Sequence, residues 1–208
     1  MMKIDIHTHS SYSDGYNTPK EMVKYAKKIG LDGIAITDHN EIKGSLNAMK
    51  YASDDFKVIP GIEVSAKEGH IICLGIEEVF ETYTPADEVI ERVHELGGVA
   101  IAAHPYDRFR RGVGDLIFKL DFDAVELYNG HTLLTYKSTK DIIEKIELPV
   151  TGGSDAHIAE DIGCVFIEVD DDIINSIKHG NVKVVSNIKR FRIIKNFLKY
   201  RLRLNSLL

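Results

Sequence analysis

Two histidines near the start of the chain, His7 and His9, are separated by one residue and are followed by Asp14 in a Ser/Asp/Gly loop. Residues 3–7 alternate apolar and polar side chains with the period of a β-strand, so both imidazoles should project to the same side where the strand ends. The carboxylate of Asp14 can turn back toward them. Two imidazoles and a carboxylate suit a divalent transition metal, but a histidine pair alone is as readily structural.

Further histidines and carboxylates stand where other strands are expected to begin or end. They are His39, Glu63, His70, His104, Asp155 and His157. His70 is the exception among them, because it opens its expected strand. Eight or nine such side chains together, without a thiolate, predict a polynuclear centre of divalent Zn, Mn or Fe ions. The remaining histidines, His94, His131 and His179, are expected to be structural or exposed.

The segments between these residues are alternately typical of strands and helices. Strand patterns cover residues 3–7, 31–37, 57–66, 70–76, 99–105, 123–129, 148–157, 163–169 and 181–187. Helical patterns cover residues 19–29, 46–51, 85–96, 134–146 and 171–179. The first helix has clear end signals, with Thr18 as N-cap, Pro19 at the first position and Gly30 as stop. This alternation predicts a mainly parallel sheet, and seven or so units favour a closed, TIM-like α/β barrel.

The domain organisation is expected to be simple. Residues 1–188 contain no Pro/Gly/Ser-rich linker, low-complexity tract or solenoid repeat, so we expect one barrel domain there and a tail over residues 189–208. The ends of the strands converge on one face of a barrel. This convergence would gather ligands that are scattered along the sequence into one site.

The composition is that of a globular protein, with 208 residues of which 44% are hydrophobic and 28% are charged. No stretch approaches the roughly 18 apolar residues of a membrane span, and the N-terminus lacks the apolar core of a signal peptide. Cys73 and Cys164 lie inside apolar runs and are expected to be reduced core residues. These features predict a cytoplasmic protein without a transmembrane segment.

Charge is distributed unevenly along the chain. Residues 173–208 hold nine Lys/Arg and no Asp/Glu, which leaves 26 − 9 = 17 basic against 32 acidic residues before them. Within residues 189–204 the basic side chains recur at helical spacing beside an apolar arc, which predicts a basic amphipathic helix. Three roles stay open for this helix: packing on the barrel or on another subunit of an oligomer, contact with RNA or another polyanion, and binding to an anionic membrane surface.

Three arginines follow His104 in a loop on the face where the ligands should lie. Arg108, Arg110 and Arg111 are candidates for binding a substrate phosphate, because the planar guanidinium matches phosphate geometry. The alternative is a solvated run of surface charge. Weaker candidates for substrate contact are Lys43, Asn129 and His131.

Two further carboxylates have two roles open to them. Asp38, beside His39, suits either a hydrogen bond that fixes the imidazole in one tautomer or an N-cap for the next helix. Glu126 suits either a hydrogen bond to a metal ligand or a plain strand-end position.

Seven short motifs occur in an order that resembles one known family. They are DIHTHSSYSDG, ITDHN, PGIEVS, GHIICLG, AAHP, VELYNG and GGSDAH. This set resembles the PHP (polymerase and histidinol phosphatase) domain family over residues 1–187. The resemblance implies a distorted seven-stranded β/α barrel, (β/α)7, with a trinuclear metal site open at the strand ends.

The resemblance also implies which residues hold each ion. His7, His9, Glu63 and Asp155 would hold one metal, Glu63, His70 and His104 a second, and Asp14, His39 and His157 a third. Glu63 would bridge the first two ions. Asp14, His39, Glu63 and Asp155 are accordingly the expected catalytic residues, and two to three ions are expected per chain.

The expected reaction is hydrolysis of a phosphate ester of a small molecule or a nucleotide by a metal-bridging hydroxide. Within the family, a nucleoside 3′,5′-bisphosphate or short RNA is favoured over a histidinol-phosphate-like monoester, because chains resembling histidinol phosphatases are usually longer. Between His70 and His104 lie only 104 − 70 − 1 = 33 residues. This leaves no room for the helical insertion of some relatives, and the site should be more open.

Two alternatives belong to other functional classes. A barrel amidohydrolase also uses a His-x-His pair, but typically adds a metal-bridging carbamylated lysine where Glu63 would serve here. A non-catalytic PHP-like subunit of an RNA-processing or replication assembly is the second alternative, to which the basic tail would be suited.

Overall fold

The computed structural model describes residues 1–189, 191, 193–196 and 198. The strands are β1 (Met2–Asp5), β2 (Gly33–Ala35), β3 (Lys57–Ile59), β4 (Gly61–Ser65), β5 (His70–Leu74), β6 (Val99–Ala102), β7 (Ala124–Asn129), β8 (Val150–Gly153), β9 (Val165–Val169) and β10 (Lys183–Ser186). The α-helices are α1 (Pro19–Lys28), α2 (Lys43–Met49), α3 (Ala86–Glu95), α4 (Thr139–Ile143) and α5 (Ile173–Lys178). Two short 3-10 helices complete the described elements, η1 (Gly114–Phe118) and η2 (Ala159–Asp161).

The helix at the start of the chain forms as its end signals predict. The Thr18 side chain accepts a hydrogen bond from the backbone of Glu21, and the two residues form a capping box with Pro19 at the start of α1. Met22 and Val23 lie on its buried face. Both side chains belong to one apolar cluster with Ile34, so the helix packs against β2.

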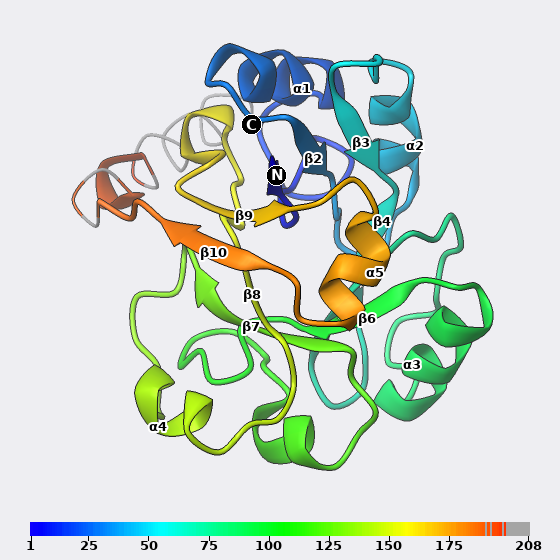
Figure 1. Cartoon of the computed structure of the whole chain (residues 1–208), viewed down its shortest axis with the longest axis vertical. Helices are drawn as coiled ribbons and strands as arrows, with labels where there is room; N and C mark the ends of the chain where they lie inside the picture. The colour runs from blue at the N-terminus through cyan, green and yellow to red at the C-terminus, as the bar shows by residue number, and fades with distance from the viewer. Residues whose placement is uncertain (190, 192, 197, 199–208) are drawn as a thin grey trace.

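The strands form two five-stranded sheets, in the orders β10-β9-β1-β2-β3 and β4-β5-β6-β7-β8. The prediction of a closed, mainly parallel barrel is not confirmed, because the described strands make no closed ring and four of their pairings are antiparallel. Figure 1 shows the strands in the middle of the molecule, with α1 and α2 at one end and α3 and α4 at the other. The fold is a mixed α/β arrangement of two sheets.

Pro60 explains part of this difference. The sequence predicts one strand over residues 57–66, but the structure divides it at Pro60 into β3 and β4, which belong to different sheets. Proline has no backbone N–H for a ladder hydrogen bond, so a sheet is readily interrupted there. The Pro60 carbonyl instead accepts a hydrogen bond from Gly75 N, at 2.8 Å.

The two sheets meet through isolated bridges rather than a continuous ladder. Thr8 is bridged to Ala156, and His39 is bridged to Glu63. The first bridge sets the His-x-His segment beside Asp155, whose N–H donates to the His7 carbonyl at 2.8 Å. Each bridge joins predicted ligands or their direct sequence neighbours, so the two bridges fix the position of the candidate site.

An apolar core joins the two sheets. Ile4 and Ile167 of the first sheet pack in one buried cluster with Ile72, Leu74 and Ile101 of the second sheet. Each of these side chains is fully buried. Because packed interiors are nearly incompressible, such a core fixes the strand ends relative to one another.

The helix predicted over residues 134–146 is shorter than expected. Residues 134–136 are instead held against the loop after β6: Arg108 N donates to the Leu134 carbonyl and Tyr136 N donates to the Tyr106 carbonyl, both at 3.0 Å. These backbone bonds take the place of helical ones, so α4 begins only at Thr139.

The predicted basic tail helix falls largely on residues 190, 192, 197 and 199–208, which lie outside the described residues. Within the described part, Ile193 N donates to the Lys189 carbonyl at 3.2 Å, and the side chains of Ile193 and Asn196 are buried.

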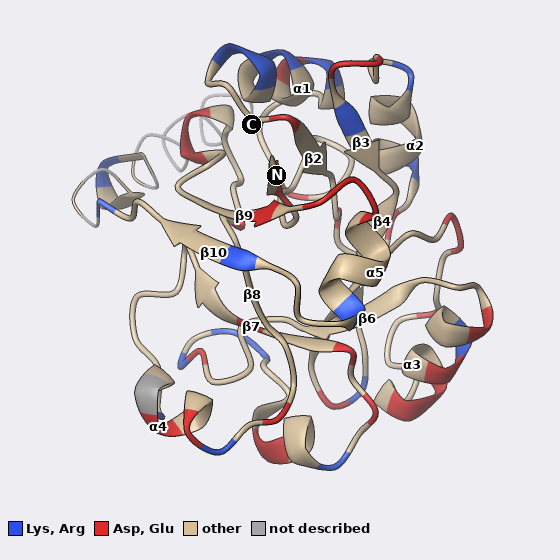
Figure 2. Ribbon diagram, viewed as in Figure 1, with Lys and Arg blue, Asp and Glu red and all other residues tan. Residues whose placement is uncertain are grey.

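In the view of Figure 2, Lys and Arg mark α1, whereas Asp and Glu mark α3 and the connection between β9 and α5.

A search for membrane spans over the described residues finds no helix that is both long and apolar enough to cross a bilayer. Neither cysteine forms a disulfide bond among the described residues; Cys73 is buried and Cys164 is half-buried. Burial raises the pKa of the Cys73 thiol above its ordinary value, so this thiol is expected to be unreactive.

We expect a thiol reagent such as DTNB to modify no more than one cysteine per native chain and two after unfolding in guanidinium. The reason is that Cys73 is inaccessible and protonated, while Cys164 is half-buried. Absorbance at saturation measures the number of reacted thiols. A Cys164→Ser variant should remove any native reaction, and two rapidly reacting thiols in the native wild type would contradict the described core.

Candidate metal centre

All nine predicted metal ligands lie in one cluster, linked by ion pairs and ring contacts. They are His7, His9, Asp14, His39, Glu63, His70, His104, Asp155 and His157. The sheet geometry explains why His70 belongs with them although it opens a strand. Strands β4 and β5 are antiparallel, and His70 pairs with Ser65, so the start of β5 lies at the same edge as the end of β4.

Glu63 lies at the centre of this cluster and is fully buried. Its Oε2 is 3.3, 3.2 and 3.1 Å from the nearest nitrogens of His7, His9 and His39, and its Oε1 is 3.1 and 3.2 Å from those of His70 and His104. The two oxygens of one carboxylate thus face two different groups of imidazoles. This is the arrangement that a carboxylate needs in order to bridge two ions.

Side chains from the two sheets complete the group around Glu63 Oε2. His7 Nε2 and His9 Nε2 are 3.1 Å apart, and Asp155 Oδ1 is 3.1 Å from His9 Nε2. A tetrahedral ion with bonds of about 2.0–2.1 Å holds its ligand atoms about 3.3 Å apart. The spacing of these donor atoms therefore fits a small divalent cation.

Four buried imidazole nitrogens have no hydrogen-bond partner among the described residues. They are the Nδ1 atoms of His9, His39, His70 and His104. Buried polar atoms are normally hydrogen-bonded, and two of these nitrogens approach Glu63 closely without the geometry of a hydrogen bond. A set of imidazoles and carboxylates that converge in this way is compatible with divalent metal ions, and neither the number nor the identity of the ions follows from it.

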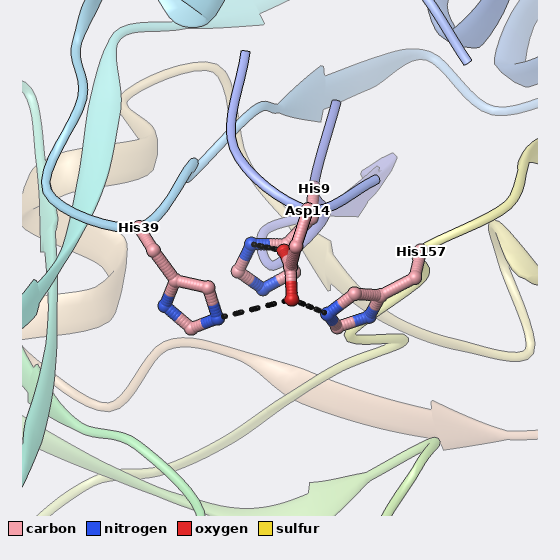
Figure 3. Close-up of side chains that lie close together, drawn as sticks. All are labelled: His9, Asp14, His39 and His157. Atoms are coloured by element: carbon pink, nitrogen blue, oxygen red, sulfur yellow. Dashed lines mark ion pairs between the residues drawn. The ribbon is translucent and has the colours of Figure 1, made fainter. Parts of the chain in front are cut away.

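A second group of donors surrounds Asp14 (Figure 3). Asp14 Oδ2 is 3.2 Å from His157 Nε2 and 3.9 Å from His39 Nε2, while Oδ1 is 4.0 Å from His9 Nδ1. His157 Nδ1 lies 2.9 Å from the Asp155 carbonyl, which can only accept, so Nδ1 carries the hydrogen. The Nε2 atom of His157 is then left as a lone-pair donor that faces this group.

Glu126 holds the opposite side of His7. Its Oε1 is 2.9 Å from His7 Nδ1, and its Oε2 accepts hydrogen bonds from His104 N at 3.1 Å and Asn129 Nδ2 at 3.0 Å. The carboxylate fixes the His7 tautomer in which Nε2 faces the cluster. Of the two roles open to Glu126, the hydrogen bond to a candidate ligand is the one that the structure supports.

Asp38 takes neither of the two roles expected for it. Its carboxylate accepts hydrogen bonds from Ser10 N, Ser10 Oγ and Ser13 Oγ at 2.7, 2.6 and 2.7 Å, and the residue before α2 has no side-chain cap. A Cβ at Gly44 would lie 1.8 Å from Asp38 Oδ2, so only glycine fits beside this carboxylate. Asp38 thereby anchors the serine loop that carries Asp14.

Burial and neighbouring charges set the protonation states of the cluster. Burial lowers the pKa of His39 to about 4 and also lowers that of His157, which favours the neutral imidazoles that coordinate metals. Burial acts against charge on Glu63 too, but His39 and His7 hold the pKa of its carboxyl well below the ordinary value. For His7, the charges of Glu126 and Glu63 outweigh burial and raise the pKa to about 10. A metal ion must therefore displace a proton from His7.

The backbone is strained at two of the candidate ligands. His104 has a φ of 28° and Asp155 a φ of 54°, in the left-handed region that residues other than glycine rarely adopt. Strain of this kind persists where the surrounding structure fixes it, and it clusters at functional sites. Here it turns both side chains toward Glu63 and the His-x-His pair.

The three arginines of the loop after β6 have different positions. Arg110 Nη1 contacts Asp155 Oδ2, and its Nη2 donates to Asp107 Oδ2 at 2.8 Å and to Asn129 Oδ1 at 3.0 Å. Arg108 is exposed. Arg111 donates to the Lys67 carbonyl instead. Only Arg110 of the three therefore reaches the cluster.

Asp107 and Thr132 escape sequence analysis, although both hold Arg110. Thr132 Oγ1 accepts from Arg110 Nη2 and donates to Asp107 Oδ2, each at 2.8 Å. Neither residue belongs to a recognisable motif, because their roles depend on two loops meeting in space. Of the weaker candidates, Asn129 lies in this network, whereas Lys43 pairs with Glu41 on the surface.

Comparison with known proteins places this arrangement in context. A family model described as the PHP domain matches residues 5–161. An uncharacterized protein of Methanocaldococcus jannaschii is 38% identical over 142 residues, which cover 62% of this chain and 83% of that protein. A phosphoribosyl 1,2-cyclic phosphate 1,2-diphosphodiesterase of Eggerthella lenta is 35% identical over 81 residues, which cover 36% of this chain and 31% of that enzyme.

A solved structure shares the fold. It is a two-domain protein of Bacteroides vulgatus containing a predicted PHP-like metal-dependent phosphoesterase, and it superposes with a TM-score of 0.72 at 18% identity over 96% of this chain and 69% of that one. At this identity the likeness concerns the fold alone. The family model, in contrast, spans well over half of the sequence and includes all nine candidate ligands. The chain therefore belongs to the PHP domain family.

Proposed function

We propose that the chain is a metal-dependent phosphoesterase that hydrolyses a phosphate ester of a small molecule or a nucleotide. The observation that carries this proposal is the position of Glu63, whose two buried oxygens face five imidazoles. The Asp155 carboxylate lies between the His-x-His pair and Arg110. Membership of the PHP family supports the same reaction class.

Three groups of side chains would hold the ions. His7, His9, Glu63 and Asp155 form the first, Glu63, His70 and His104 the second, and Asp14, His39 and His157 the third. When bound, divalent ions supply a nucleophile at neutral pH and stabilise charge on the transferred phosphoryl group. Zn, Mn and Fe all suit these ligands.

The remaining residues of the site orient these ligands and the substrate. Glu126 and the Asp155 carbonyl hold His7 and His157 with Nε2 toward the cluster. Arg110 is held by Asp107 and Thr132 with its guanidinium at the rim. A phosphate that approaches the cluster would replace Asp155 as the partner of this guanidinium, which would orient the ester for attack.

A nucleoside 3′,5′-bisphosphate or a short RNA is the substrate class we favour, with a histidinol-phosphate-like monoester as the alternative. The similarity to a cyclic phosphate diesterase supports phosphoester chemistry in general. The amidohydrolase alternative is less well supported, since Glu63 would serve here as the bridging group for which that class typically uses a carbamylated lysine. Nine converging candidate ligands likewise favour an enzyme over a scaffold.

The test combines metal analysis with an activity screen. The purified protein is analysed by inductively coupled plasma mass spectrometry and assayed with Mn, Zn or Fe on a panel of phosphate esters that includes nucleoside 3′,5′-bisphosphates and short RNA. Two to three ions per chain with turnover of at least one ester are expected. A chain without bound metal and without turnover under every condition would overturn the proposal in favour of the scaffold.

Replacing Arg110 by alanine is expected to lower kcat/KM by about 10- to 100-fold, because a charged hydrogen bond to a phosphate contributes about 1.5–3 kcal/mol. An Arg110→Lys variant keeps the charge but not the planar fork, so we expect an intermediate loss. Arg108→Ala is the matched control, because Arg108 is exposed in the same loop. Equal losses for Arg108→Ala and Arg110→Ala would show a general charge effect instead of a specific contact.

A further inference from the structure

A line of side chains leads from the C-terminal segment to the candidate metal centre. Asn196 Nδ2 donates to Asp161 Oδ1 at 2.6 Å, and Asp161 Oδ2 lies 3.1 Å from His131 Nε2. The ring of His131 stacks on His157, with centroids 5.6 Å apart and an interplanar angle of 30°. His157 is a candidate ligand of the third group, so the line ends at the site itself.

The Asp161 carboxylate and the Asn196 amide are buried, and the hydrogen bonds of the line have a defined direction. Asp161 is 2% exposed and Asn196 is 8% exposed. The Asp161 carboxylate can only accept, so Nε2 of His131 carries the hydrogen that it donates. One oxygen of Asp161 thus holds His131, while the other is held by Asn196. A buried carboxylate oxygen that loses its donor costs more free energy than an exposed one.

His131 is also fixed from its backbone side. Its N–H donates to Asn129 Oδ1 at 2.9 Å, and the same oxygen accepts from Arg110 Nη2 at 3.0 Å. The imidazole therefore lies between the arginine network and His157. A shift of its ring would be transmitted to both, because the contacts on either side are direct.

We propose that Asn196 and Asp161 are positioning residues for His131, and that the C-terminal segment thereby becomes part of the site. Asn196 lies beyond residues 5–161, the span that the family model matches. Of the described residues of this segment, Ile193 and Asn196 are buried against the domain. Only the kinetic part of the test below rests on the proposed function.

The first test replaces Asn196 by alanine. We expect kcat on p-nitrophenyl phosphate to fall about tenfold, with KM changed less than twofold. A tenfold loss is the lower end of the range seen when a hydrogen bond behind a metal ligand is removed. In histidine-selective NMR spectra, the ring resonances of His131 and His157 should shift. Asn187→Ala is the matched control, because Asn187 is an exposed asparagine that precedes the same segment.

The second test exchanges the two partners. Asn196→Asp alone leaves two carboxylates facing each other and should lose activity, whereas Asp161→Asn alone still offers Asn196 both a donor and an acceptor and should lose less. The double variant Asp161→Asn/Asn196→Asp again offers one donor to one acceptor, with an oxygen left for His131, and should recover most of the loss. A purely structural role would not predict rescue of kcat.

Two results would overturn the proposal. One is an Asn196→Ala protein with wild-type kcat and unshifted histidine resonances. The other is a double variant no better than the worse of the two single variants. If the chain has no phosphoesterase activity, the NMR shifts still decide the question, so failure of the brace and failure of the proposed function are distinguishable.

Discussion

Glu63→Gln is expected to lower phosphoesterase kcat by about three orders of magnitude and to remove at least one metal ion per chain, since metal ions supply both nucleophile and charge stabilisation. The change keeps the shape of the side chain but removes the charge that faces five imidazoles. One of its two oxygens becomes an amide nitrogen, which cannot bind a cation. Metal content and steady-state kinetics on the same preparation measure both effects.

The control for this variant is Glu168→Gln. Glu168 lies on β9 and pairs with Lys183 at the surface, so the same chemical change there should leave kcat and metal content within twofold of wild type. If Glu63→Gln fails to fold, Asp14→Asn serves as a second test of the candidate centre, because the Asp14 side chain is 50% exposed. A Glu63→Gln enzyme with normal metal content and normal kcat would refute the central role given to this carboxylate.

The ligands themselves could be predicted because strand ends carry a strong sequence signal. His7, His39 and Asp155 each follow an apolar strand, and short motifs around them are specific to one family. Their convergence depends only on strands that end at one edge, whether or not the sheet closes. The predicted ligands therefore lie together in the structure although the sheets do not close into a barrel.

The residues that hold the ligands in place were harder to predict. Asp38 and Asp107 owe their roles to loops that meet in space, and Arg110 differs from Arg108 only in the direction of its side chain. No periodicity or spacing encodes these contacts. The break at Pro60 was visible in the sequence, but the apolar residues on both sides favoured one continuous strand.

The same reasoning applies to the C-terminal segment. Its basic and apolar spacing predicts a helix, yet the contact that ties it to the site is made by Asn196, which belongs to neither pattern. A polar residue that becomes buried against a distant carboxylate leaves no periodic signal. Such contacts emerge only when the two segments are placed together.

Removal of the metal ions is expected to lower the melting temperature by about 8–16 °C. Ligands present at about a thousand times their Kd stabilise a fold by about 4 kcal/mol, and each kcal/mol shifts Tm by about 2–4 °C for a chain of this size. Without cations, the unpartnered nitrogens of the buried histidines stay unsatisfied, and His7 must hold a proton against its burial. Differential scanning calorimetry before and after dialysis against EDTA measures the shift, and restoring Mn or Zn should reverse it.

Two variants separate this effect from general damage by the chelator. His94 pairs with Asp123 outside the candidate centre, so His94→Gln should keep the whole EDTA-induced shift in Tm. Glu63→Gln should lose most of the shift, because it has already lost the ions that the chelator would remove. An equal EDTA-induced shift in Tm in both variants would mean that the stabilising ions bind elsewhere. A shift confined to proteins with an intact Glu63 would instead tie stability and catalysis to the same buried carboxylate.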